Sequence, residues 1–277
     1  MKKIFVLLFL ALALCSFRSP ELSWVAIGDS FTYLNDHTDE TGNRVSKGYL
    51  TQTTENFPGL HVINKGYNGW TAGDIARHID ELGLVKADFY SILLGTNDWW
   101  QGRKVGTIED YKSNRGNNSV YGSFRIIIDK IRSMNPNANI LLITPMQRTD
   151  FVYINDAHNN AYGSYKPKNG QYLEEFANAI DSIGLLENIP VADLFHDHKL
   201  RIEKLMNFKR VKDPHSGLYR NYKYPESTGI PFDPNKDEYP YPENSINFSY
   251  DGLHPSDKGN KVISKLIIKA FKSMLSR

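Results

Sequence analysis

Three short polar motifs, far apart in the chain, carry the residue types that serine-based hydrolysis needs. They are Gly28-Asp29-Ser30, Gly95-Thr96-Asn97-Asp98 and Asp251-Gly252-Leu253-His254-Pro255. A serine hydroxyl becomes a good nucleophile when a histidine takes its proton and a carboxylate holds that histidine in the correct tautomer. The sequence therefore predicts Ser30 as the nucleophile, His254 as the base and Asp251 as the residue that orients His254.

The motif Gly95 to Asp98 offers a hydrogen-bond donor beside this triad. It ends the apolar run Phe89 to Leu94, and loops at the carboxyl ends of parallel strands meet at one edge of a sheet. The Asn97 amide could therefore donate to the oxyanion that forms during acyl transfer. We interpret Asp29 and Asp98 as hydrogen-bonded loop anchors. Each motif alone is also explained as a turn or a capped helix start, and it is their conjunction that favours catalysis.

In this order and at these separations, the motifs resemble those of the GDSL or SGNH hydrolases, a family named after its Ser, Gly, Asn and His residues. The family's first, third and fifth blocks correspond to Ile27–Phe31, Gly95–Asp98 and Asp251–Pro255. Phe31 stands where the name GDSL has leucine, which changes a buried neighbour and no reacting atom. The resemblance covers nearly the whole mature chain, and it implies a serine esterase or lipase that needs no metal and no other cofactor.

The second block of the family is the loosest match. Asn64 to Thr71 contains two glycines, and the family's oxyanion glycine corresponds better to Gly69, which precedes a Trp-Thr pair and an expected helix. Gly66 is the alternative. The resemblance then implies three oxyanion donors, namely the backbone N–H groups of Ser30 and Gly69 and the side-chain amide of Asn97.

Short apolar runs alternate with longer amphipathic stretches, and this alternation predicts a parallel sheet covered by helices on both faces. The expected strands are Trp24 to Ile27, Leu60 to Ile63, Phe89 to Leu94, Ile140 to Thr144 and Ile189 to Ala192. The expected helices are Gly48 to Asn56, Ala72 to Leu82, Val120 to Met134, Gln171 to Ile183 and Ser256 to Leu275. We predict an α/β fold: a three-layer α/β/α sandwich around a five-stranded parallel, doubly wound sheet of flavodoxin-like strand order.

Residues 1–20 have the pattern of a signal peptide, and residues 21–277 form the predicted hydrolase domain. Two lysines precede the apolar run Ile4 to Leu14, which is shorter than the roughly 18 residues of a spanning helix. We therefore expect an exported protein that is periplasmic, secreted or lipid-anchored at the cell surface. Cys15, the one cysteine of the sequence, lies where a bacterial lipoprotein carries its acylated cysteine, so a lipid anchor and free secretion both stay open.

The composition limits the kinds of partner that we expect for the chain. Its 277 residues carry a formal charge of only +2, with basic and acidic residues mixed along the chain, so we expect no nucleic-acid partner. One irregular segment, at about 195–250, is rich in Tyr and Pro and leads into Asp251. Long irregular connections in compact domains are usually functional or disordered, so we expect this insertion to face the substrate, with a passive surface loop as the alternative.

Two further groups of residues are candidates for ligand contacts. Trp99 and Trp100 follow the Asn97 motif and, with Trp70, are predicted to contact the substrate, because exposed tryptophan faces suit sugar rings and acyl chains. The alternative for one of the pair is packing in the core. Asp193 to His198 contains two histidines and two aspartates, a composition that suggests a metal. Such a cluster at a strand end is more often hydrogen-bonded surface structure, so we predict no metal site.

The expected substrate is a small ester or an acylated glycan. Export, the tryptophan pair and the tyrosine-rich insertion together favour a carbohydrate esterase that removes acetyl or another small acyl group. A lysophospholipase, a thioesterase-type lipid hydrolase or an O-acetyltransferase would use the same triad. A hypothesis of another class is a glycan-binding module that has lost turnover.

Overall fold

The central sheet of the protein is parallel throughout, and it positions the covering helices and the loops that carry the predicted site. The structure is a computed structural model that describes residues 21–276. The strands are β1 (Leu22–Gly28), β2 (Leu60–Gly66), β3 (Phe89–Leu93), β4 (Asn139–Ile143) and β7 (Val191–Ala192), in the spatial order β2-β1-β3-β4-β7. This is the flavodoxin-like order, so the predicted fold class is confirmed, and most strand bounds differ from the expected ones by one to three residues.

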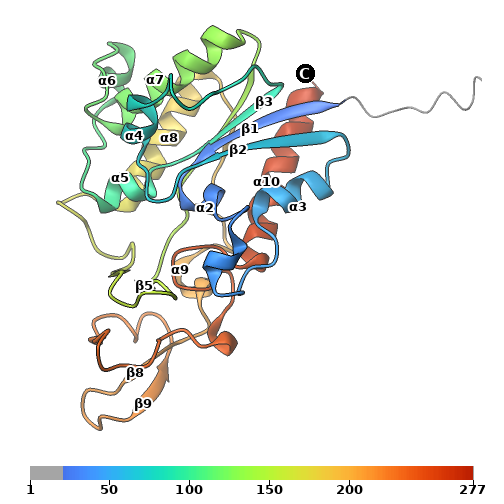
Figure 1. The fold of residues 1–277 in the computed structure, drawn as a ribbon. Coiled ribbons are helices and arrows are strands. Elements are labelled where there is room, and N and C mark those ends of the chain that lie inside the picture. The colour runs from blue at the N-terminus through green and yellow to red at the C-terminus, as the bar shows by residue number, and fades with distance from the viewer. Residues whose placement is uncertain (1–20, 277) are drawn as a thin grey trace, which may run out of the picture.

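Helices cover both faces of the sheet (Figure 1). One face carries α4 (Ala72–Arg77), α7 (Val120–Met134) and α8 (Leu173–Glu187), and the other carries α3 (Tyr49–Glu55) and α10 (Asp257–Leu275). Alternate residues of β1 pack into the hydrophobic cores on the two faces of the sheet. Val25 and Ile27 pack with the first group of helices, and Trp24 and Ala26 pack with the second. All four are fully buried, as expected for a strand covered on both faces.

Short helices begin where β1 and β3 end, at the motifs that the sequence singles out. They are α2 (Ser30–Tyr33) and α5 (Thr96–Trp100), and α6 (Ile108–Lys112) follows. Asp29 is the N-cap of α2, and its side chain accepts a hydrogen bond from the Phe31 backbone N–H at 3.1 Å. This cap places Ser30 on the first turn, at the carboxyl edge of the sheet.

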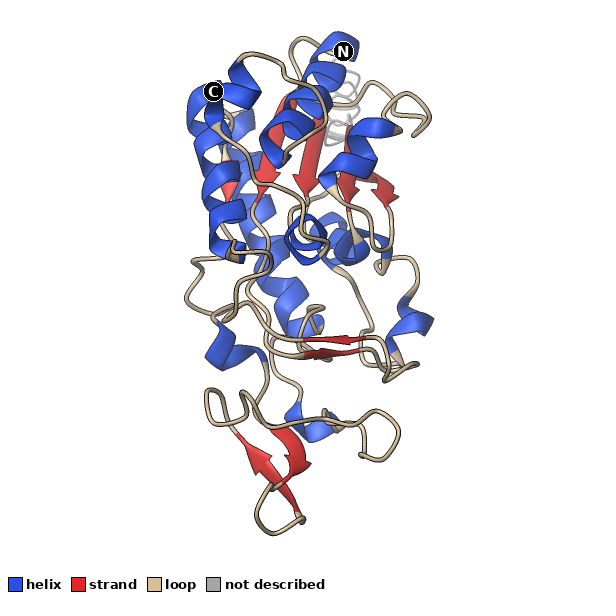
Figure 2. Ribbon diagram, turned by 90° about the vertical axis from the view of Figure 1, so that its left-hand side faces the viewer, coloured by secondary structure: helices blue, strands red, loops and turns tan. Residues whose placement is uncertain are grey.

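Loop-rich structure lies below that carboxyl edge (Figure 2). It contains the 3₁₀ turns η1 (Thr38–Thr41) and η2 (Glu243–Ser245), the short helix α9 (Ile202–Leu205) and two small antiparallel ribbons, β5 (Phe151–Val152) with β6 (Asn160–Ala161) and β8 (Lys209–Lys212) with β9 (Tyr219–Tyr222). The segment 195–250 supplies α9, β8, β9 and η2. Its Lys209 pairs with Asp150 at 2.6 Å, and both side chains are largely buried, which ties the segment to the loop after β4.

Within residues 21–276, no helix is long and apolar enough to cross a membrane. The predicted signal peptide and the predicted anchor position Cys15 lie outside the described residues.

Candidate active site

The structure brings the three predicted triad residues together in one hydrogen-bonded line. The Oγ of Ser30 lies 2.9 Å from Nε2 of His254, and Nδ1 of His254 lies 2.7 Å from Oδ2 of Asp251. A carboxylate at Nδ1 fixes the ring proton there, so Nε2 is the nitrogen that accepts from the Ser30 hydroxyl. The Asp251 carboxylate is itself held, because its Oδ1 accepts the backbone N–H groups of Leu253 and His254 at 2.9 and 2.7 Å.

Aromatic rings surround the imidazole of His254 and limit its movement. Phe31 and Phe151 lie at ring-centroid distances of 5.7 and 5.5 Å, and Tyr250 stacks on the imidazole at 5.9 Å and 19°. Only 7% of the His254 surface is exposed, and Asp251 is fully buried. The base is therefore oriented by a carboxylate on one side and by hydrophobic packing around its ring.

The predicted oxyanion donors lie around the same pocket, which has a volume of about 280 Å³ and is lined by Ser30, Gly69, Asn97 and His254 among others. The backbone N–H groups of Ser30 and Gly69 donate to no described residue. Asn97 donates one Nδ2 hydrogen to the Trp70 carbonyl at 2.9 Å, which orients the amide and leaves its second hydrogen available. Gly66 does not line the pocket, so the geometry favours Gly69 of the two candidate glycines.

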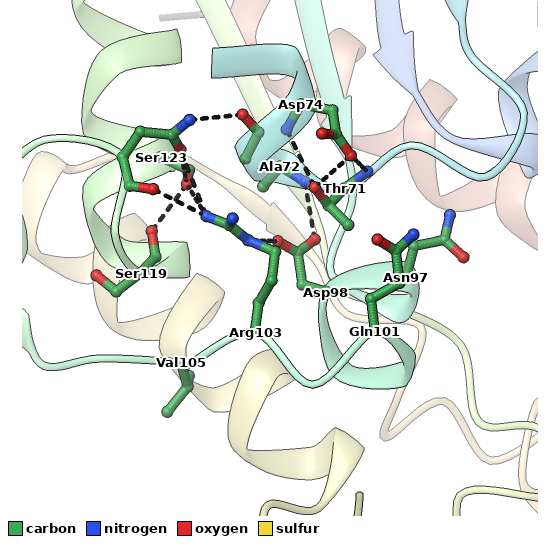
Figure 3. A network of polar contacts seen from close by, with 12 residues as sticks. Thr71, Ala72, Asp74, Asn97, Asp98, Gln101, Arg103, Val105, Ser119 and Ser123 are labelled. Carbon is green, nitrogen blue, oxygen red and sulfur yellow. Dashed lines mark hydrogen bonds and ion pairs between the residues drawn. The ribbon is translucent and has the colours of Figure 1, made fainter. Parts of the chain in front are cut away.

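A buried polar network holds the α5 helix, which contains Asn97, against the start of α4 (Figure 3). The Asp98 carboxylate accepts the Ala72 backbone N–H at 2.8 Å and the Nε–H of Arg103 at 3.1 Å. Arg103 also donates to Ser123 on α7 at 3.2 Å. Burial raises the pKa of Asp98 from 3.8 to about 6, although these donors oppose the shift. Asp98 thus joins α5 to the start of α4 beside the pocket.

The three candidate tryptophans have different environments in the structure. Trp100 lines the pocket, whereas Trp99 is fully buried and donates its Nε1–H to the Gln171 carbonyl at 2.9 Å. The prediction that Trp99 contacts substrate is therefore wrong, because its ring belongs to the core. Trp70 stacks on Tyr67 at 4.4 Å and does not line the pocket, so its predicted contact with substrate is not supported either.

Several pocket residues carry no motif that could be recognised in the sequence. They are Gln101, Arg148, Tyr153 and Asn159. Arg148 had the clearest signal, since it follows the apolar run of β4 and thus belongs to the functional edge of the sheet. Of the described chain, no residue between 195 and 250 lines this pocket. The segment instead lines an adjoining hollow of about 240 Å³, through Lys209 and residues 229–232, and supports His254 through Tyr250.

The acidic and histidine-rich run after β7 lies apart from the pocket. Asp181, Asp193 and His196 bring their ligand atoms within 4.8 Å of one another, and His196 already hydrogen-bonds Asp193 at 2.8 Å. His198 stands beside Asp197 instead, 4.0 Å away. His196 is thus paired with Asp193 and, at 3.6 Å, with Glu174, as is common for surface residues.

Comparison with known proteins agrees with the class of protein that the fold and the site define, a serine-type carboxylic ester hydrolase on a doubly wound sheet. The family model described as the GDSL-like lipase/acylhydrolase family matches residues 26–262. The chain belongs to this family. No curated protein matches it.

Solved structures give the same result. A protein from Chitinophaga pinensis DSM 2588, described as a possible lipase, is 62% identical with a TM-score of 0.90, over 92% of this chain and 99% of that one. The acetyl xylan esterase AlAXEase is 17% identical with a TM-score of 0.52, over 90% and 99% of the two chains. An acetylxylan esterase from Geobacillus stearothermophilus, solved as a catalytic mutant, is 16% identical with a TM-score of 0.50, over 91% and 94%. The last two likenesses concern the fold alone.

Proposed function

We propose that the protein hydrolyses a small acyl ester, most simply acetyl, on a carbohydrate, with Ser30, His254 and Asp251 as its catalytic triad. The observation that carries this proposal is the hydrogen-bonded line from Ser30 Oγ through His254 to Asp251, at 2.9 and 2.7 Å, beside a pocket with unused N–H donors. Ser30 Oγ attacks the ester carbonyl carbon while His254 Nε2 takes its proton. The alcohol leaves with that proton, and water then cleaves the acyl-enzyme by the same route.

The oxyanion of each tetrahedral intermediate would lie among the N–H groups of Ser30 and Gly69 and the Asn97 amide. Such donors stabilise the charge that develops in the transition state more than they stabilise the neutral ester. Their orientation is set in advance: the Asn97 amide is held by the Trp70 carbonyl, and the Gly69 carbonyl accepts from Gln101 at 2.9 Å. Little reorganisation is then needed during the reaction.

The shape and lining of the pocket support a small acyl group on a polar alcohol. A volume of about 280 Å³ is small for a long acyl chain. Side-chain amides of Asn68, Gln101 and Asn159 line it together with the Trp100 ring, a combination that suits hydroxyl groups and a sugar face. Two of the structurally similar proteins are described as acetylxylan esterases, which adds support for acetyl esters of a glycan.

The test compares short and long acyl esters and then a natural type of substrate. We expect the mature protein to hydrolyse p-nitrophenyl acetate well above p-nitrophenyl octanoate and to release acetate from an acetylated glycan such as acetylated xylan. Ser30→Ala should lose at least about a thousandfold in kcat, whereas Ser133→Ala, an exposed serine on α7, should match the wild type. A preference for octanoate would favour a lipid substrate, and inactivity of the folded wild type on every ester would favour a glycan-binding module.

We also propose that the protein is exported. The lysine-flanked apolar run at the N-terminus supports this, and Cys15 makes a lipid anchor one of the two routes. Fractionation of cells that express the full chain, with and without Cys15→Ala, tests both. If the protein is exported and its membrane-bound fraction is the same in Cys15→Ala, the lipid anchor is refuted. If the full chain stays in the cytoplasm, export is refuted.

A further inference from the structure

A buried guanidinium forms part of the wall of the catalytic pocket. Arg148 lies five residues after the end of β4, and only 2% of its surface is exposed. Its charged carbon lies 4.8 Å from the Trp99 ring centroid and 4.5 Å from that of Trp100. The two aromatic rings give the cation partial compensation for the water it has lost.

The hydrogen bonds of this guanidinium are far from complete. Nη2 donates to the Tyr162 carbonyl at 2.8 Å, which occupies one of five N–H groups. Nε is buried without a partner among the described residues, and Nη1 donates to none of them. Burial lowers the pKa of Arg148 to about 10, so the side chain is still protonated at neutral pH. A buried charge with unused N–H groups lowers the stability of the fold unless a further partner binds those groups.

The nearby carboxylates are already engaged. Asp150 pairs with Lys209 at 2.6 Å, and Asp251 is bound to His254, so neither forms an ion pair with Arg148 within 4.0 Å. Glu40 also lines the pocket, and its carboxylate accepts a hydrogen bond from the Tyr33 hydroxyl at 2.8 Å. The Asp150 and Asp251 charges stabilise the guanidinium from a distance, but no carboxylate of the described residues binds Arg148 directly.

The other groups near Arg148 are neutral or basic. The pocket is otherwise lined mainly by amides, hydroxyl groups and apolar side chains. Lys168 places its Nζ 4.2 Å from the Trp100 centroid, on the ring that Arg148 also contacts. Glu40 is the acidic residue of the pocket lining and is bound by the Tyr33 hydroxyl, whereas Arg148 has no directly bound anion, so the Arg148 side of the pocket is complementary to a ligand that carries a negative charge.

We propose that Arg148 forms a carboxylate subsite in the catalytic pocket, so that the preferred ester substrate carries a carboxylate close to its ester group. This inference rests on the proposed esterase function and narrows its substrate class. The carboxylate has two sources, an acidic sugar that bears the acyl group or a dicarboxylic acyl group itself. In either case the anion would accept the Nη1 hydrogens of Arg148, which the described residues leave unused, and it would supply a directly bound counter-charge.

Matched ester pairs test the subsite in both positions. For the acyl side, p-nitrophenyl hemiglutarate is compared with p-nitrophenyl pentanoate. For the alcohol side, acetylated polygalacturonate is compared with the same polymer after its carboxylates are converted to amides. We expect the anionic member of at least one pair to have about tenfold or higher kcat/KM, mainly through KM, and the advantage to shrink as salt is raised.

Substitution of Arg148 then assigns the preference. Arg148→Met should bring the ratio of anionic to neutral kcat/KM close to one, and Arg148→Lys should retain part of it. Lys168→Met removes the same charge from the neighbouring lysine and should keep most of the ratio. A wild type without preference in either pair, or a preference that survives in Arg148→Met, would overturn the subsite.

A binding measurement keeps the test decisive if the Arg148 variants do not fold. The Ser30→Ala protein is titrated calorimetrically with glutarate and galacturonate, and with the corresponding amides glutaramide and galacturonamide. Binding of either acid at least about tenfold more tightly than its amide is expected, and equal or absent binding of both acids contradicts the subsite. Because this readout needs no turnover, an inactive wild type that still selects the acid would refute the esterase proposal and leave the carboxylate site standing.

Discussion

The carboxylate next to the proposed nucleophile is buried, and its ionisation is linked to stability. Asp29 is 2% exposed and accepts the Phe31 N–H that starts α2. Burial raises the pKa of Asp29 from 3.8 to about 7, although the Phe31 hydrogen bond and the charge of His254 oppose the shift. The folded protein therefore holds this proton more tightly than the unfolded chain does.

This shift predicts that Asp29→Asn becomes progressively more stabilising as pH rises from about 4 to 7. Below pH 3.8 the carboxyl is protonated in both states, and between 3.8 and about 7 only the unfolded chain ionises, so wild-type stability falls across that window. Asparagine keeps the acceptor for the Phe31 N–H and has no charge to bury. Urea unfolding of both proteins at pH 4, 5.5 and 8 should show a difference that grows to at most about 4 kcal/mol and then stays constant. A difference independent of pH would contradict the raised pKa.

Asn97 should contribute to turnover much more than to binding, because the oxyanion exists only in the transition state. We expect Asn97→Ala to lower kcat by about a hundred to a thousandfold with little change in KM. Steady-state kinetics on p-nitrophenyl acetate provide the measurement. Asn221→Ala, in the exposed strand β9, is the matched control and should behave as the wild type. Equal losses in both variants, or a loss confined to KM, would be inconsistent with an oxyanion donor.

Ser30, His254 and Asn97 could be predicted from the sequence because each lies in a short motif with a recognisable composition. Trp99 could not be separated from Trp100 in this way. These neighbours project about 100° apart on α5, and only the packing of that helix decides which ring enters the core. Arg148 was missed for a related reason, since its burial and its missing partner arise from contacts with residues distant in the chain.

At the scale of elements, the long periodic helices and the sheet strands were predicted well, and the elements that were missed are short. The α7 helix, Val120–Met134, has the predicted bounds, because a capping Ser119 and a clear apolar stripe define it. The α2 and α5 helices were not predicted, since their first turns consist of the polar catalytic motifs. The β8–β9 hairpin was missed as well, because its strands, KRVK and YRNY, carry little apolar alternation.

The two glycines at and just after the end of β2 provide a prediction at this scale. A Cβ on Gly66 would lie 2.2 Å from the backbone nitrogen of Tyr33, so α2 would have to shift and carry Ser30 with it. Gly69 has a φ of 76°, and a Cβ added there would meet no atom within 4 Å, so only backbone strain opposes alanine at this position. We expect Gly66→Ala to lower the free energy of unfolding by about 3 kcal/mol or more and Gly69→Ala by about 1 to 2 kcal/mol. Urea denaturation checks the order, and its reversal would contradict the close approach of α2 and β2.

At the scale of the whole molecule, the segment 195–250 is joined to the sheet domain through a buried ion pair. Lys209 is 5% exposed and Asp150 is 15% exposed at the side-chain level. Asp150 also accepts the Gly163 N–H at 3.1 Å and a hydrogen bond from the Tyr165 hydroxyl. The segment could be recognised from its composition, but its attachment could not be predicted because the partners are 59 residues apart.

Removing one partner of this pair should be far more harmful than removing both charges. Lys209→Met leaves the Asp150 carboxylate buried without its cation, and we expect a loss of about 3 to 5 kcal/mol in the free energy of unfolding. Adding Asp150→Asn should recover at least half of it. Lys236→Met, which breaks the exposed pair with Asp233, is the control and should change stability by less than about 1 kcal/mol. Similar small effects for Lys209→Met and Lys236→Met in thermal or urea unfolding would refute the structural role of the buried pair.

Covalent trapping of the nucleophile tests the central claim most directly, because it requires an activated serine and no assumption about the substrate. The folded mature protein is treated with a fluorophosphonate, and the adduct is measured by intact mass and mapped to a peptide. We predict one adduct per chain on Ser30, none on Ser30→Ala, and labelling at least about a hundredfold slower in His254→Ala. No adduct on the folded wild type, or an adduct on another residue, would contradict the assignment of Ser30, His254 and Asp251 as a catalytic triad.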